Sequence, residues 1–228
     1  MSTTKTPEST RGSIGQGLYS LGDLRTYLAL DGQPKDGDRA LYWLTDVLNP
    51  VGHQPQHADY SFTDLVSLFV VRELLKRGVK RRRIREAEQY FRKVLRTDRP
   101  FACEEITTDG RDVYGPGGKA APGMPAQLEA ASRGGQHVLR EPIKDALHTI
   151  RYAEGAAAEW TPMPGVVLNP EIQFGAPVID GTRVHTDLAA DVVRKLGMDE
   201  AIARWPHAKP GTIDQAIEFE RRLAALSN

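Results

Sequence analysis

Apolar residues recur at helical spacing near the start of the chain. Leucines at positions 21, 24 and 28 predict a first helix, which Ser20 and Asp23 can cap as a capping box. A second helix is expected from about Asp38 to Leu48, because its leucines fall on one face and Asn49-Pro50 would end it. The segment 51–60 is rich in Gly, Pro, Gln and His, which favours an exposed hairpin or loop that would project as a wing.

The same spacing continues to about residue 100. Ser61 can cap a third helix that ends at Arg77-Gly78, and a fourth is expected from Lys80 to about Arg96. In the fourth helix the apolar residues repeat at helical spacing and form the inner face, and the outer face is strongly basic. Pro100 closes this block.

Beyond Pro100 the pattern predicts short strands. The segments 101–108 and 111–114 flank Asp109-Gly110, a strong two-residue hairpin signal, and residues 148–153 and 156–160 can pair around Gly155. A short helix is expected over 142–147, after a loop dense in Gly and Pro at 115–123.

The last seventy residues combine two short strands with three helices. The strands are expected at 166–168 and 177–179. The first helix would be capped by Thr186 and stopped by Gly197; the others are expected at about 199–205 and 212–226.

These elements predict a mainly α fold with small β elements. A chain of 228 residues is long enough for two or three domains that each bury a core. We expect a disordered leader at 1–17, an N-terminal helical domain at 18–98, a β-containing middle region at 99–159 and a C-terminal domain at 160–228.

Charge divides the chain into a basic and an acidic half. Residues 1–99 carry 17 Lys and Arg against 12 Asp and Glu, whereas residues 100–228 carry 13 against 18. This division indicates an anionic partner such as nucleic acid for the first half and a protein partner for the second; the alternative is a chance asymmetry.

The residues that commonly carry catalysis or bind metal are sparse. Cys103, the single cysteine, excludes an intramolecular disulfide and favours a reducing, cytoplasmic location; its neighbours Glu104 and Glu105 make it a poor nucleophile. His53 and His57 lack a third ligand nearby in sequence. We therefore expect no enzyme activity, no cofactor and no metal.

The basic half has the composition of a DNA reader. A recognition helix buries one face and offers polar or aromatic side chains to the major groove, a division that the segment 38–48 has. Cations elsewhere would contact phosphates. The candidate DNA-binding residues are Arg25, Lys35, Arg39, Tyr42, Trp43, His53, Lys80, Arg81, Arg82 and Arg83. The alternatives are a solvated helix face for the cluster 80–85 and a half-buried core position for Trp43.

The N-terminal motifs resemble MerR-type winged helix-turn-helix domains. The strings Tyr19-Ser-Leu-Gly-Asp-Leu, Leu41-Tyr-Trp, Tyr60-Ser-Phe-Thr-Asp-Leu and Leu74-Leu-Lys-Arg-Gly-Val-Lys carry the resemblance over about residues 18–98. It departs from the usual pattern in a longer connection at 31–37 and a long wing. The resemblance implies a homodimer that reads paired half-sites.

The most specific string lies near the C-terminus. Residues 166–184 read Val-Val-Leu-Asn-Pro-Glu-Ile-Gln-Phe-Gly-Ala-Pro-Val-Ile-Asp-Gly-Thr-Arg-Val. Gly175 and Gly181 permit positive φ, so Thr182 and Arg183 would lie on a rigid turn; the alternative is that these residues only build the turn. With Thr186 and the final helices, the string resembles the VapB antitoxin-like domain of unknown function.

This second resemblance implies a C-terminal three-helix, helix-turn-helix-like domain in an antitoxin. Such an antitoxin would bind and silence a PIN-like (VapC-type) ribonuclease toxin and repress its own operon. The candidate toxin-binding residues are Thr182, Arg183, His185, Arg194 and Lys195. A basic side chain at 183, 194 or 195 could occupy the metal position of the toxin's acidic site. Two rival functions stay open: a stand-alone MerR-like regulator with a ligand-sensing middle region, and a protein-interaction module without DNA binding.

Overall fold

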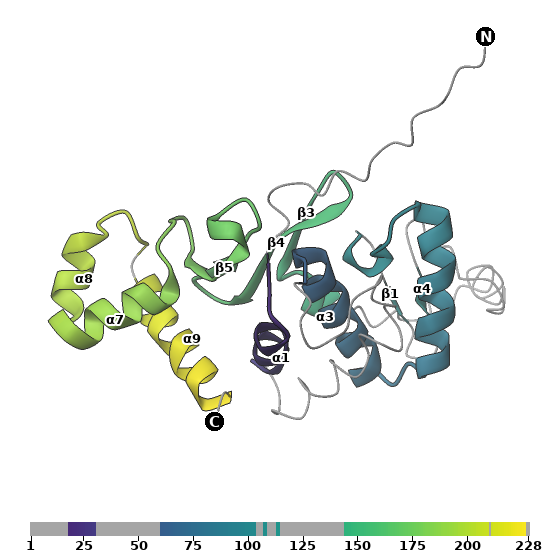
Figure 1. Cartoon of the computed structure of the whole chain (residues 1–228), viewed down its shortest axis with the longest axis horizontal. Coiled ribbons are helices and arrows are strands. Elements are labelled where there is room, and N and C mark those ends of the chain that lie inside the picture. The colour runs from purple at the N-terminus through teal and green to yellow at the C-terminus, as the bar shows by residue number, and fades with distance from the viewer. Residues whose placement is uncertain are drawn as a thin grey trace, which may run out of the picture.

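The computed structural model describes residues 18–30, 60–103, 107–108, 113–114, 144–209 and 211–226. Over these residues the fold is mainly helical, with one small four-stranded antiparallel sheet (Figure 1). The predicted leader, second helix and wing lie outside the described residues.

The first two described helices begin with the same local structure. Helices α1 (Leu21–Ala29) and α3 (Phe62–Lys76) each have a serine N-cap and an aspartate at the third helical position, and both capping boxes are complete. The residues just before the caps, Tyr19 and Tyr60, exchange two backbone hydrogen bonds of 2.9 Å. The starts of α1 and α3 are therefore joined side by side.

A buried arginine joins the other end of α1 to α3. Arg72 is almost fully buried, donates to the carbonyl oxygen of Leu28, pairs with Glu73 at 2.9 Å and lies 4.8 Å from the ring centre of Phe69. A buried cation is tolerated only where its hydrogen-bonding groups have partners, as here. This contact fixes the C-terminal end of α1 against α3.

The next elements pack on α3. Helix α4 (Arg81–Leu95) follows, and a 3₁₀ turn, η1 (Pro100–Ala102), contacts both α3 and α4. We predicted strand structure from residue 101 onwards; this was wrong for Phe101 and Ala102, because Phe101 is fully buried and the turn places it in the core. The antiparallel pairing is confirmed, since β1 (Thr107–Thr108) pairs with β2 (Val113–Tyr114), but the two-residue turn was wrong, because Thr108 pairs with Val113 and four residues connect the strands.

The four-stranded sheet has the simple order β3-β4-β5-β6. It follows the short helix α6 (Lys144–Leu147) and consists of the strands Ile150–Ala153, Ala156–Met163, Val166–Leu168 and Val178–Ile179. The predicted pairing around Gly155 is confirmed, although β4 runs three residues beyond the predicted end at Trp160.

Three helices complete the chain. They are α7 (Thr186–Leu196), α8 (Met198–Arg204) and α9 (Thr212–Leu226), close to the predicted bounds. The predicted cap was wrong by one residue: His185 is the N-cap of α7 and Thr186 is its first helical residue. The hydroxyl of Thr186 is instead used for packing, because it donates to the carboxylate of Glu220 on α9 at 2.5 Å.

Most of the apolar side chains form one core. It includes Leu24 of α1, Leu65 of α3, Ile84 of α4, Trp160 of β4 and Phe219 of α9. A second, smaller core lies between β6 and the three C-terminal helices. The larger core therefore crosses the expected boundaries at 98 and 159, and the division into separate domains stays a prediction.

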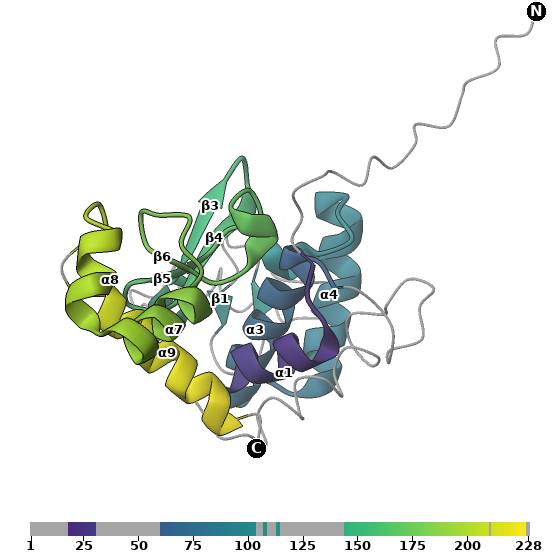
Figure 2. The same cartoon turned by 60° about the vertical axis from the view of Figure 1, so that its left-hand side comes forward.

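Helix α1 lies between the N-terminal helices and the C-terminal helix (Figure 2). The ring of Tyr27 is 6.3 Å from that of Phe219 on α9, and the Tyr19 hydroxyl donates a buried hydrogen bond of 2.8 Å to the carbonyl oxygen of Gly175. These contacts join segments separated by more than 150 positions in the chain.

Removing the Tyr19 hydroxyl tests this long-range contact. Tyr19→Phe is expected to lower the free energy of unfolding by about 1–3 kcal/mol, because it leaves the buried Gly175 carbonyl without this partner. Urea denaturation measures the loss. Tyr90→Phe is the matched control, since the Tyr90 hydroxyl has no hydrogen-bond partner in the described part of the chain. Equal stability of the two variants would contradict the assignment.

Candidate nucleic-acid and protein interfaces

Helix α4 and its flanking residues form the most basic segment of the chain. Between Lys80 and Arg96 the net charge is +6, from eight cations and two glutamates. One glutamate, Glu88, is buried and paired with Arg92, and the other, Glu86, contacts Arg82 at 3.2 Å and Arg83 at 3.1 Å. The carboxylates therefore offset only part of the positive charge, and a net charge of +6 remains on the segment.

The outward face of α4 carries a stripe of cations that is densest towards its two ends, with Glu86 and Gln89 between them. Ile84, Ala87 and Phe91 are buried against the core, so the opposite face is exposed. Arg82 and Lys93 are eleven residues apart on that face, which is about 16 Å along a helix. Such a stripe is long enough to follow several phosphates of one nucleic-acid strand. Lys93 and Arg96, which we did not single out from the sequence, extend this surface; the helical period of Arg82 and Lys93 is the signal that identifies them.

The start of α4 has an unfavourable arrangement of charge. Lys80 is the N-cap but its side chain makes no capping hydrogen bond, and the first turn contains cations and no acidic residue. The N-terminus of a helix carries partial positive charge, so cations there are destabilising unless an anion is nearby. A bound phosphate would supply that anion.

The other candidate DNA-binding residues are divided by the structure. Arg25 is exposed on α1, and Lys80, Arg81 and Arg82 are exposed at the start of α4, with Arg83 half-buried beside them. The remaining candidates lie outside the described residues: Lys35, Arg39, Tyr42, Trp43 and His53.

The C-terminal signature forms a rigid turn after β6. The Thr182 amide and hydroxyl both donate to the carbonyl oxygen of Ile179, at 3.0 and 2.9 Å, and the Val184 amide donates to the Thr182 hydroxyl at 3.0 Å. Gly181 has a φ of 76°, which residues other than glycine rarely adopt. Thr182 thus holds the turn together, and its hydrogen-bonding groups are used within the turn.

The cations near this turn differ in their surroundings. Arg183 is exposed and makes no ion pair within the described part of the chain. Arg194 and Lys195, also exposed, share the carboxylate of Asp191, at 2.5 and 3.6 Å. His185 is half-buried at the N-cap of α7. Among the predicted toxin-binding cations, Arg183 has the side chain best placed to meet a partner's carboxylate.

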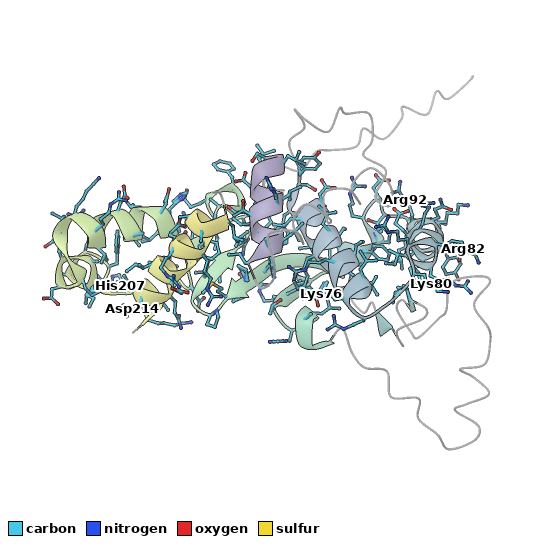
Figure 3. The ribbon with its side chains drawn as sticks, turned by 90° about the horizontal axis from the view of Figure 1, so that it is seen from below. Lys76, Lys80, Arg82, Arg92, His207 and Asp214 are labelled. Atoms are coloured by element: carbon cyan, nitrogen blue, oxygen red, sulfur yellow. The ribbon has the colours of Figure 1, made fainter. Side chains whose placement is uncertain are left out.

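The two candidate surfaces lie far apart. Helix α4 occupies one end of the longest axis and helices α7 and α8 occupy the other (Figure 1). Viewed from below, Lys80, Arg82 and Arg92 gather at the α4 end, whereas His207 lies at the opposite end (Figure 3). Partners at the two ends could bind at the same time.

A half-buried carboxylate, that of Glu220, links α7 to α9. Burial raises the pKa of Glu220, the hydrogen bond from Thr186 opposes this effect, and the charge of Asp187 adds to it. Glu220 also lies near Tyr27 of α1, so its charge state bears on the contact between α1 and the C-terminal helices.

No catalytic or metal centre stands out in the described residues. They contain no cluster of three or more potential metal ligands among His, Cys, Asp and Glu. Burial raises the pKa of the Cys103 thiol, which makes its thiolate less accessible. Within the same residues, no helix is both long and apolar enough to cross a bilayer.

Two comparisons with known proteins each found a similar protein, and a third found none. No protein-family model matches the chain. The chain is similar to a protein of Mycobacterium tuberculosis (strain ATCC 25618 / H37Rv) named "Putative antitoxin VapB45". The two are 28% identical over 185 residues, which cover 77% of this chain and 76% of that protein. Its fold also matches the crystal structure of Rv2018 from Mycobacterium tuberculosis, with a TM-score of 0.59 and 22% identity over 87% of this chain and 96% of that one. The second likeness shows the fold alone.

Glu220 gives the structure a testable pH dependence. Because its pKa is raised above the ordinary value of 4.5, the folded state holds this proton more tightly than the unfolded chain does. The contribution is therefore most favourable below pH 4.5 and is lost as the pH rises through the folded-state pKa. Glu220→Gln removes this loss, so we expect its stability relative to the wild type to increase with pH in urea denaturation.

Glu218→Gln is the matched control on the same helix. Hydrogen bonds from Arg221 and Arg222 lower the pKa of the exposed Glu218 to about 2, so its replacement should give no relative gain as the pH rises. A Glu220→Gln variant whose relative stability stays constant between pH 4 and 8 would contradict the burial of this charge.

Proposed function

We propose that the protein is the antitoxin of a type II toxin-antitoxin pair. It binds and neutralises a PIN-like (VapC-type) ribonuclease toxin and represses its own operon by binding DNA. The observation that carries this proposal is the similarity to the antitoxin relative, which extends over about three quarters of both chains. In this proposal the protein acts in the cytoplasm as a regulator and has no enzyme activity.

The DNA-binding half of the proposal is supported by charge. The α4 stripe supplies the cations that a phosphate backbone attracts, and the capping motifs of α1 and α3 belong to the MerR-like resemblance. We assign base recognition to the predicted second helix through Arg39, Tyr42 and Trp43, and phosphate contacts to α4. In this proposal a homodimer reads two half-sites.

The toxin-binding half is supported by the rigid turn and its exposed cation. Thr182 fixes the backbone of the turn. The exposed Arg183 forms no ion pair with a carboxylate of the described residues. The acidic site of a PIN-like ribonuclease would attract this guanidinium, which can form two hydrogen bonds to one carboxylate. Arg194 and Lys195 would contribute less, because Asp191 already neutralises part of their charge.

Replacing the cations at the start of α4 tests the DNA interface. The triple change Arg81→Ala, Arg82→Ala and Arg83→Ala should weaken binding to operator and to unrelated duplexes alike, because phosphate contacts carry no sequence information. The slope of log K against log salt should fall by up to about 2.7 if all three contact phosphates. Mobility shifts at several salt concentrations measure this slope.

The matched control replaces Arg194 and Lys195 at the other end of the molecule and should leave DNA binding unchanged. If the triple variant keeps the affinity and salt slope of the wild type, the basic cluster is a solvated helix face. If the wild type itself binds no DNA, the rival of a protein-interaction module is favoured.

Co-expression with the product of the neighbouring small gene tests the antitoxin assignment. The wild-type chain should form a stable complex and relieve growth arrest, whereas Arg183→Ala should weaken the complex by about thirtyfold or more, because removing one member of a buried charged pair costs about 2 kcal/mol or more. Arg222→Ala, an exposed arginine on α9 paired with Glu218, is the control. A wild-type chain that forms no complex and gives no rescue would remove the antitoxin proposal.

A further inference from the structure

The turn before β6 places a large apolar side chain in solvent. Phe174 is 69% exposed, and Leu18, whose amide donates to the Phe174 carbonyl oxygen at 3.4 Å, is 70% exposed. These are the two most exposed large hydrophobic residues in the described part of the chain. This backbone hydrogen bond brings two exposed apolar residues from distant segments close together, and we call the pair the apolar surface.

The backbone of this turn is held in an unfavourable conformation. Gln173 and Phe174 have φ values of 48° and 55°, in the left-handed region that residues with a Cβ rarely adopt, and Gly175 follows at 86°. The conformation does not serve core packing, because it directs the Phe174 side chain into water. Strain of this kind accumulates at binding sites, where the surrounding structure maintains it.

The surrounding structure does maintain the turn. The Tyr19 hydroxyl donates to the Gly175 carbonyl oxygen, and the Gln173 side chain donates to the Arg183 carbonyl oxygen at 3.2 Å. The apolar surface is thus fixed both to α1 and to the signature turn that carries Arg183. The backbone that carries Phe174 is thus held close to the turn that carries Arg183, and aromatic residues and arginine are both enriched in protein interfaces.

We propose that Phe174, with Leu18 beside it, inserts into an apolar pocket of the toxin whose rim supplies a carboxylate for Arg183. This inference rests on the proposed antitoxin function. A second copy of this chain is a less suitable occupant, because a two-fold contact centred on Phe174 would bring two Arg183 residues to the same interface. A toxin surface with carboxylates complements the charge instead.

Phe174→Gly separates binding from stability. Glycine adopts the left-handed conformation without strain, so the full-length variant should melt at the wild-type temperature or above it, while its affinity for the purified toxin falls by about 30-fold, as for a hot-spot residue. Glu154→Gly is the matched control, because Glu154 has a φ of 53° in the exposed β3–β4 turn, and it should keep wild-type affinity. Phe174→Tyr retains the ring and should bind within about threefold of the wild type.

Isothermal titration and size-exclusion chromatography distinguish the outcomes. If the wild type binds the toxin and Phe174→Gly binds it equally tightly, this inference is wrong while the antitoxin proposal stands. If the wild type does not bind the toxin, the proposed function fails first. A Phe174→Gly variant that loses self-association but retains toxin affinity would assign the surface to a second copy and overturn the inference.

Discussion

The burial of α1 is the constraint on which the rest of the structure depends. Leu24 and Leu28 are fully buried in the larger core, while Tyr27 faces α9 and Tyr19 faces the loop before β6. Burying two leucines completely contributes about 3–6 kcal/mol. Because this one helix contacts both α3 and α9, the basic end and the C-terminal end are parts of a continuous packed body.

That continuity shapes the proposed function. A DNA-binding surface on α4 and a toxin-binding surface near Arg183 would be carried on separate parts of one packed body, so both partners could bind together. The basic stripe on α4 would raise the affinity for DNA without adding sequence selectivity, because the phosphates are the same in every sequence. Selectivity would come from the predicted recognition helix, and partner choice from the turn at 173–184.

Local signals in the sequence predicted much of the fold. The capping box of Ser20 and Asp23 predicted the start of α1, and Ser61 predicted the start of α3. Gly155 and Gly197 marked a hairpin and a helix end, because these signals depend only on neighbouring residues. Long-range packing decided the features that were missed. Phe101 enters the core as part of a 3₁₀ turn, and Thr186 donates to Glu220 on a distant helix, neither of which local sequence specifies. For the candidate sites, the charge pattern predicted the start of the α4 surface. No sequence signal identifies the positive φ of Phe174, because a phenylalanine rarely adopts this conformation and only its neighbour Gly175 is of a residue type that often does.

The most direct measurement of the central claim is the assembly formed by the protein, operator DNA and the purified toxin together. Light scattering after size-exclusion chromatography gives the mass of each species. Two separate interfaces predict a single ternary species that contains all three components, heavier than either binary complex. Mutually exclusive binding, in which adding toxin releases free DNA and no ternary mass is found, would contradict the account.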